Sequence, residues 1–138
     1  MKLQELRIGN WVLIPFSMDG VIIPSAEKQV LGIGKFGGID FTKPEYPDDL
    51  IIPAIHCAGI PLTEEWLRKL HNEDEISISK RFPNEITIYG RFLFIWKENY
   101  KYWYVIEEYH KKYLTKIEFV HEYQNFIFAL TGEELTIK

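Results

Sequence analysis

The sequence predicts an α+β protein with short antiparallel strands, on three observations. Six of the seven prolines and seven of the nine glycines lie at or before residue 61, which excludes long helices from that part of the chain. Fifteen of the 21 aromatic residues lie between Phe82 and Phe128, where side chains alternate with the period of a strand. Two segments, residues 61–70 and 120–132, carry helix signals.

Composition places the chain among ordinary globular proteins. With 138 residues it is expected to form one domain or two very small ones, and 46% hydrophobic with 26% charged residues excludes collagen-like and disordered classes. A net charge of −4 disfavours nucleic acid as a partner. No stretch approaches about 18 uncharged apolar residues and no signal-peptide pattern is present, so we expect a cytoplasmic protein without a membrane partner.

Residues 1–61 are expected to form a small all-β unit. Strands are predicted at residues 7–14, 21–23, 29–36, 38–41 and 50–52, separated by Gly, Pro and Asp turns. The first strand is predicted to end before Pro15, because proline has no amide hydrogen to donate. Strands of this number and length favour a curled antiparallel sheet the size of an SH3-like β-barrel.

Residues 62–138 are expected to form an α+β unit, packed with the first as one domain or separate from it. Thr63 is placed to cap a short helix whose first turn holds Glu64 and Glu65. A meander follows, with strands at residues 76–79, 85–89, 92–96 and 102–106. An amphipathic helix at residues 120–131, ended by Gly132, is predicted to cover this sheet, and the aromatic rings are predicted to fill the space between.

Three phrases carry a resemblance to a known family. Residues 6–12, 59–67 and 120–135 resemble a family of small uncharacterised proteins from Bacteroidetes genomes, prophages and phages. Because the phrases lie at the start, middle and end of the chain, the resemblance implies a full-length relative. It implies an origin in a mobile element, and it brings no activity or catalytic residue with it.

Several motifs that suggest chemistry lack the context that chemistry needs. Residues 32–37 match the glycine spacing of a dinucleotide-binding loop, but no helix follows, so we interpret the glycines as turn residues and expect no cofactor. Cys57 is the single cysteine, which excludes disulfide scaffolds and zinc modules. Its neighbour His56 points to the opposite side of an extended chain and cannot share its proton. The paired acidic residues show no metal-ligand spacing.

The best polar constellation lies on the second helix. His121, Asn125 and Phe128 recur at helical spacing with Gln124 beside them, so that one helix face presents an imidazole and two amides. These groups are suited to binding a ligand edge or a partner backbone, and we take them as the candidate binding residues. The alternative, which we favour, is that they satisfy neighbouring main-chain groups. An enzymatic role for His121 requires an acidic or thiol partner to converge on it.

A second candidate surface lies between residues 97 and 116. Tyr102 and Tyr104 alternate with Lys101, Lys111 and Lys112 nearby, which is the interleaving of a single-stranded nucleic-acid platform. The stretch contains five lysines and three glutamates, a balance of only +2. We therefore favour a non-enzymatic interaction module that binds a protein partner or itself, and keep single-stranded nucleic-acid binding as the alternative.

Overall fold

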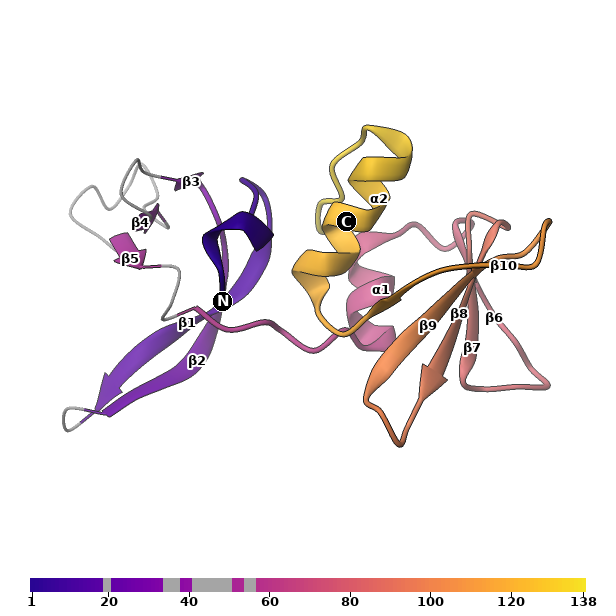
Figure 1. The fold of residues 1–138 in the computed structure, drawn as a ribbon, viewed down its shortest axis with the longest axis horizontal. Helices are drawn as coiled ribbons and strands as arrows, with labels where there is room; N and C mark the ends of the chain where they lie inside the picture. Colours follow the sequence, from indigo (N-terminus) through magenta and orange to yellow (C-terminus); the bar gives the residue numbers. More distant parts are fainter. Residues whose placement is uncertain (19–20, 34–37, 41–50, 54–56) are drawn as a thin grey trace. The chain divides into compact units, whose positions relative to one another are not determined.

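The structure is a computed structural model that describes residues 1–18, 21–33, 38–40, 51–53 and 57–138 (Figure 1). In chain order the elements are η1 (Leu3–Glu5), β1 (Trp11–Met18), β2 (Val21–Gln29), β3 (Gly32–Ile33), β4 (Gly38–Asp40), β5 (Ile51–Pro53), α1 (Glu64–Leu70), β6 (Ile76–Ile78), β7 (Glu85–Ile88), β8 (Phe92–Lys97), β9 (Tyr102–Glu107), β10 (Lys112–Ile117) and α2 (Val120–Thr131). The predicted α+β class is confirmed: within these ranges there are two α-helices, and the strands pair antiparallel. Neither helix among the described residues is long and apolar enough to cross a membrane.

The chain divides into two compact units. Unit 1 comprises Met1–Pro61 and Phe119–Glu134, and unit 2 comprises Leu62–Glu118 and Leu135–Lys138. The division is more complex than one cut in the sequence, because α2 returns to the first unit.

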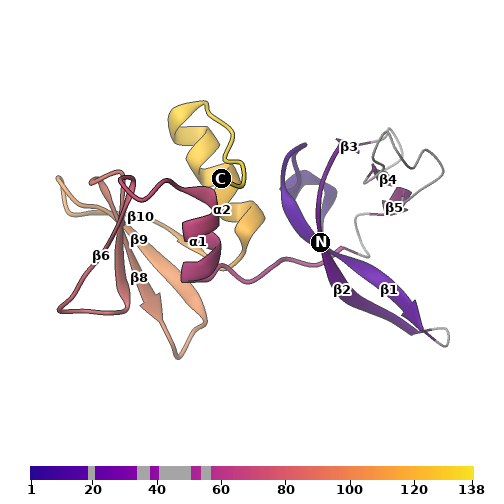
Figure 2. The same ribbon diagram turned by 180° about the vertical axis from the view of Figure 1, so that it is seen from behind.

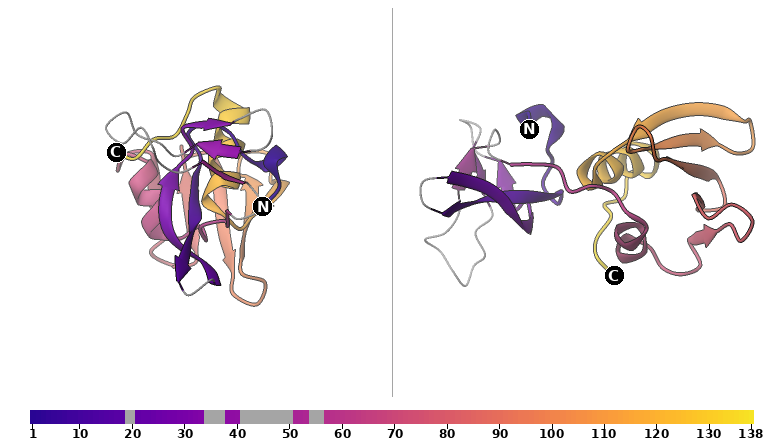
Figure 3. Two further views of the ribbon diagram at one scale, coloured as in Figure 1. Left: turned by 90° about the vertical axis from the view of Figure 1, so that its left-hand side faces the viewer. Right: turned by 90° about the horizontal axis from the view of Figure 1, so that it is seen from below.

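Unit 1 contains two small sheets, β1-β2 and β3-β4-β5, among its described residues. Leu6, Val12, Ile14, Val30, Ile39 and Cys57 form its buried apolar cluster. No closed barrel is formed by the part of this unit that the structure describes, so the SH3-like expectation is not confirmed. Figure 3 shows β1 and β2 side by side, and they pair antiparallel.

The prediction that the first strand ends before Pro15 is wrong. Strand β1 continues to Met18, and its register shifts between Ile14 and Pro15. Pro15 then stands opposite Pro24. Two residues that lack an amide hydrogen therefore share one position of the ladder, next to an irregularity that already interrupts the hydrogen bonding.

Helix α2 forms where the sequence predicts it, but it groups with unit 1. The carboxylate of Glu122 accepts a hydrogen bond from the backbone N–H of Phe119 at 3.1 Å, which satisfies a donor at the helix start. Gly132 ends the helix in the left-handed conformation with φ 73°, and its N–H donates to the carbonyl of Phe128. The sequence favoured this helix as the cover of the meander, whereas its contacts described below are to the N-terminal segment.

Unit 2 is a five-stranded antiparallel meander with α1 against one face (Figures 1 and 2). Its order is β10-β9-β8-β7-β6, so each strand pairs with its neighbour in sequence and β8 is central. The predicted cap of α1 is confirmed, because Thr63 Oγ1 accepts a hydrogen bond from Trp66 N at 3.3 Å. Trp103 Nε1 donates to the carbonyl of Leu62 at 2.8 Å and fixes the start of α1 on that side of the sheet.

The two faces of the meander differ in burial. On the α1 side Ile86, Ile88, Phe92, Phe94, Trp103, Val105 and Ile117 are buried. The alternate positions, which we call the open face, are partly or fully exposed. The open face consists of Ser77 on β6, Glu85 and Thr87 on β7, Leu93, Ile95 and Lys97 on β8, Tyr102, Tyr104 and Ile106 on β9, and Tyr113 and Lys116 on β10.

The prediction that the rings after Phe82 fill the core is right for some of them and wrong for others. Of the fifteen aromatic residues between Phe82 and Phe128, four are buried, namely Phe92, Phe94, Trp103 and Tyr123. Five are exposed, and Tyr109 is the extreme at 85%. The remaining six are partly buried, so core packing accounts for only part of the aromatic residues of this segment.

One close approach in unit 1 yields a stability prediction. A Cβ added at Gly59 would lie 2.5 Å from Cγ of Phe119, closer than side-chain atoms can approach. We expect Gly59→Ala to destabilise the protein by about 1–3 kcal/mol, because the ring must move in a packed environment. Urea unfolding monitored by circular dichroism measures the loss.

A double-mutant cycle separates this contact from a general effect of alanine. In the Phe119→Ala background the ring is absent, so Gly59→Ala is expected to cost almost nothing. An equal cost in both backgrounds would show that the contact with Phe119 is not the cause.

Candidate functional site

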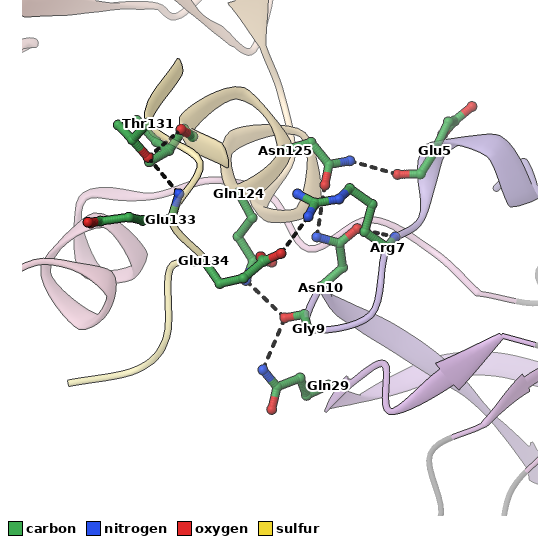
Figure 4. Close-up of polar contacts among 11 residues, drawn as sticks. Glu5, Arg7, Gly9, Asn10, Gln29, Gln124, Asn125, Thr131, Glu133 and Glu134 are labelled. Carbon is green, nitrogen blue, oxygen red and sulfur yellow. Dashed lines mark hydrogen bonds and ion pairs between the residues drawn. The ribbon is translucent and has the colours of Figure 1, made fainter. Parts of the chain in front are cut away.

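The amides on α2 bind the backbone of the N-terminal segment (Figure 4). Gln124 Oε1 accepts from the N–H of Trp11 at 2.8 Å, and Gln124 Nε2 donates to the carbonyl of Gly9 at 3.0 Å. Asn125 Nδ2 donates to the carbonyl of Glu5 at 2.9 Å, and its Oδ1 accepts from Asn10 Nδ2 at 3.0 Å. Both side chains therefore use donor and acceptor groups to hold α2 against residues 5–11.

An arginine contacts the C-terminal end of the same helix face. The guanidinium of Arg7 lies 3.4 Å from the centre of the Phe128 ring, and its Nη2 forms an ion pair with Glu134. Arg7 N also donates to Asn10 Oδ1 at 2.8 Å. Phe128 is thus covered by a stacked cation, and this contact secures the last turn of α2. No sequence pattern marks the roles of Arg7 and Glu134, since these residues lie 127 positions apart.

His121 is buried in this region of unit 1. Its ring stacks on Phe119 with 5.8 Å between centroids, and its Nε2 lies 3.9 Å from Oε2 of Glu5. Neither ring nitrogen has a hydrogen-bond partner among the described residues. Burial lowers the pKa of His121 below 6.5, and the N-terminal ammonium lowers it further, while the carboxylate of Glu5 opposes them. The neutral imidazole is therefore the form that this environment favours at neutral pH.

The described residues give no support to a catalytic cysteine at Cys57 or to a dinucleotide-binding loop at residues 32–37. Cys57 is buried, and burial raises the pKa of its thiol, so that little thiolate forms at neutral pH. His56 and residues 34–37 lie outside the described residues. Strands β3 and β4 flank the glycine-rich stretch and pair antiparallel, which differs from the strand-to-helix arrangement of a dinucleotide site. No group of three or more metal-ligating side chains occurs in the described part of the chain.

The five residues of the nucleic-acid alternative do not lie on one surface. Tyr102 and Tyr104 are on the open face of the meander. Lys101 lies in the turn after β8, where it forms an ion pair with Glu98. Lys111 lies in the turn before β10 with φ 53°. Lys112 stands opposite Glu107, whose side chain belongs to the other face of the sheet.

Two other lysines accompany the tyrosines of the open face. Lys97 Nζ lies 5.7 Å from the centre of the Tyr104 ring, and Lys116 Nζ lies 5.4 Å from the centre of the Tyr102 ring. Tyr104 also stacks on Tyr113, with 4.5 Å between ring centres. Period-two alternation along β8 and β9 predicts Lys97 on the side of Tyr102 and Tyr104. The same alternation cannot place both Tyr113 and Lys116 on that side, because the register of β10 shifts between Tyr113 and Thr115.

The registers arrange the open face in rows across the strands. One row runs Glu85, Ile95, Tyr104, Lys116, and each residue stands directly opposite the next. A second row runs Ser77, Thr87, Leu93, Ile106, Tyr113. In a third, Lys97 stands opposite Tyr102. The middle of the face is therefore aliphatic and aromatic, with charged groups at its margins.

The binding of Gln124 to the backbone yields a second stability prediction. We expect Gln124→Met, which keeps the length of the side chain, to destabilise the protein by about 2–4 kcal/mol. The reason is that the N–H of Trp11 and the carbonyl of Gly9 lose their bonds to the amide. Denaturant unfolding at pH 7.5 measures the effect, and a loss below about 0.5 kcal/mol would contradict it.

Burial of His121 predicts a pH dependence of stability. In the unfolded chain its imidazole titrates near 6.5, and in the folded protein the pKa is lower, so the unfolded state binds more protons. The free energy of unfolding is therefore expected to fall as the pH is lowered from 7.5 to 5.5.

The variant His121→Gln is expected to have a shallower pH dependence over this range, by up to about one proton taken up on unfolding. Gln124→Met is the matched control, because this neighbouring buried substitution changes stability without removing a titratable group. The same slope in wild type and His121→Gln would contradict the prediction.

Comparison with known proteins finds no relative of this chain. No family model matches the chain, and no curated protein or solved structure matches it significantly. Assignment of a function therefore depends on the chemistry of the surfaces described above.

Proposed function

We propose that this protein is a non-enzymatic interaction module whose binding surface is the open face of the unit 2 meander. The observation that carries the proposal is the row of half-exposed side chains, Ile95 and Tyr104 in the centre with Glu85 and Lys116 at the ends. Tyrosine is enriched in protein interfaces because it offers a large rigid contact area and a polar group, and charged margins give specificity.

The size of the open face supports the proposal. Five strands about 4.8 Å apart, with up to six residues at about 3.3 Å each, give a face of roughly 20 Å by 20 Å, or about 400 Å². The apolar and aromatic centre occupies part of this area, and contiguous apolar patches of a few hundred Å² on soluble proteins are often functional. Leu93, Ile95 and Ile106 form its apolar part, at positions where a sheet face meant only for water usually carries polar side chains.

Single-stranded nucleic acid is the second candidate, and the placement of lysines beside tyrosine rings favours it. Bases stack on such rings and lysines meet phosphates. Against it, Glu85 lies in the same row as Lys116, and the protein as a whole carries a net charge of −4. A protein partner uses both signs of charge, whereas a phosphate backbone uses only the lysines, so we propose the protein partner.

The cellular setting that we propose follows from the sequence. The phrases at residues 6–12, 59–67 and 120–135 support an accessory protein of a Bacteroidetes prophage or phage, acting in the cytoplasm. The single cysteine agrees with a reducing compartment.

Site-specific photocrosslinking tests the proposed surface. Tyr104 is replaced by benzoylphenylalanine, cells making the variant are irradiated, and adducts are identified by mass spectrometry and reconstituted with purified components. We expect adducts with protein, because Tyr104 lies at the centre of the open face. The matched control carries the same replacement at Tyr109, an exposed turn residue, and is expected to give none of these adducts.

Two outcomes contradict the proposal. Equal adducts from both positions, or none from Tyr104, would show that the open face binds no protein. Salt-dependent binding of short single-stranded oligonucleotides that is lost in Tyr104→Ala would favour the second candidate instead.

A further inference from the structure

We infer that the occupant of the open face is a second copy of this chain, stacked face to face about a two-fold axis parallel to the strands. This inference rests on the proposed function, since it names the partner of the same surface. It follows from the order of residues in the rows.

The row Glu85, Ile95, Tyr104, Lys116 has opposite charges at its ends, about 14 Å apart across three strand spacings. Within the part of the chain that the structure describes, neither Glu85 nor Lys116 forms an ion pair. A binding partner that supplies a cation at one end and an anion at the other complements both. A second copy of this row, turned around, has that arrangement.

A two-fold axis between β8 and β9, lying in the interface along the strand direction, exchanges β8 with β9 and β7 with β10, and leaves β6 at the rim. Glu85 of one copy then faces Lys116 of the other, and the reciprocal pair forms at the other end. Ile95 faces Tyr104 in the same way. Both copies therefore bury apolar groups against apolar groups while their charges pair at the margins.

The other rows obey the same operation. In the second row Leu93 faces Ile106, so aliphatic side chains meet in the middle of the interface. In the third, Lys97 faces Tyr102, a pair of cation and ring. Two twisted sheets stack in this way at about 10 Å, with their strands within about 30° of each other.

The area that the two faces can bury is small for a stable complex. Two faces of about 400 Å² bury roughly 800 Å² together, which is below the 1,200–2,000 Å² of stable complexes. We therefore expect a reversible dimer with a Kd on the order of 10–100 μM, and a monomer at low concentration.

Sedimentation velocity of the full chain between about 5 and 500 μM tests the dimer. Either charge reversal, Glu85→Lys or Lys116→Glu, is expected to raise the Kd about ten- to a hundredfold, because two attractive pairs become repulsive. The double variant Glu85→Lys/Lys116→Glu is expected to return to within about threefold of wild type, since both pairs are restored with exchanged sign. The control Lys111→Glu, a reversal in a turn outside the open face, is expected to leave the Kd unchanged.

Mixing the two single variants gives the sharper test. The Glu85→Lys chain carries a lysine at each end of the row, and the Lys116→Glu chain carries a glutamate at each end. In a mixed dimer both pairs therefore attract, and the mixture is expected to dimerise where neither variant alone does.

Two results would overturn the second copy as occupant of the open face. One is a wild-type chain that stays monomeric to about 500 μM, well above the expected Kd. The other is a pair of charge variants that do not rescue each other when mixed. If crosslinking from Tyr104 then identifies a different protein, the proposed function stands while this inference fails.

Discussion

The larger part of unit 2, Leu62–Glu118, is inserted between the two segments of unit 1, and backbone hydrogen bonds join the chain where it leaves unit 1 and where it returns. Val120 N donates to the carbonyl of Ile60 at 2.9 Å on the unit 1 side. Leu62 N donates to the carbonyl of Glu118, also at 2.9 Å, on the unit 2 side. Because these two pairs fix both ends of the insertion, α2 can complete unit 1 after 57 intervening residues of unit 2. Gly59 is required at this place, since the Phe119 ring occupies the position of a side chain.

The return of α2 explains why its polar face is buried. Its apolar positions Val120, Tyr123 and Ile127 could be predicted from their spacing, and they are buried. The face with Gln124 and Asn125 could be found in the sequence, but its partners could not, because those partners are mainly backbone groups of residues 5–11. Any residue types present the same N–H and C=O groups, so no sequence pattern marks them.

Irregular strand pairing limits the prediction of the sheets. The side chains of strands β6 to β9 alternate regularly, so these strands could be placed to within a few residues from the sequence. Strand β10 could not be predicted in this way. Its ladder shifts between Tyr113 and Thr115, so its side chains do not keep a period of two along the sequence. The continuation of β1 past Pro15 was missed as well, because proline is a strand breaker only where its partner strand requires an amide.

Composition alone cannot distinguish the buried aromatic rings of unit 2 from the exposed ones. A strand with apolar side chains on both faces, such as β8, predicts two covers, and in unit 2 α1 supplies one of them. The second face remains half-exposed, with Leu93 and Ile95 beside Tyr104. An uncovered face with apolar side chains favours association with another apolar surface. Charges of both signs at the ends of one row restrict that association to partners with the reversed order, and the same chain, rotated by a half-turn, has that order.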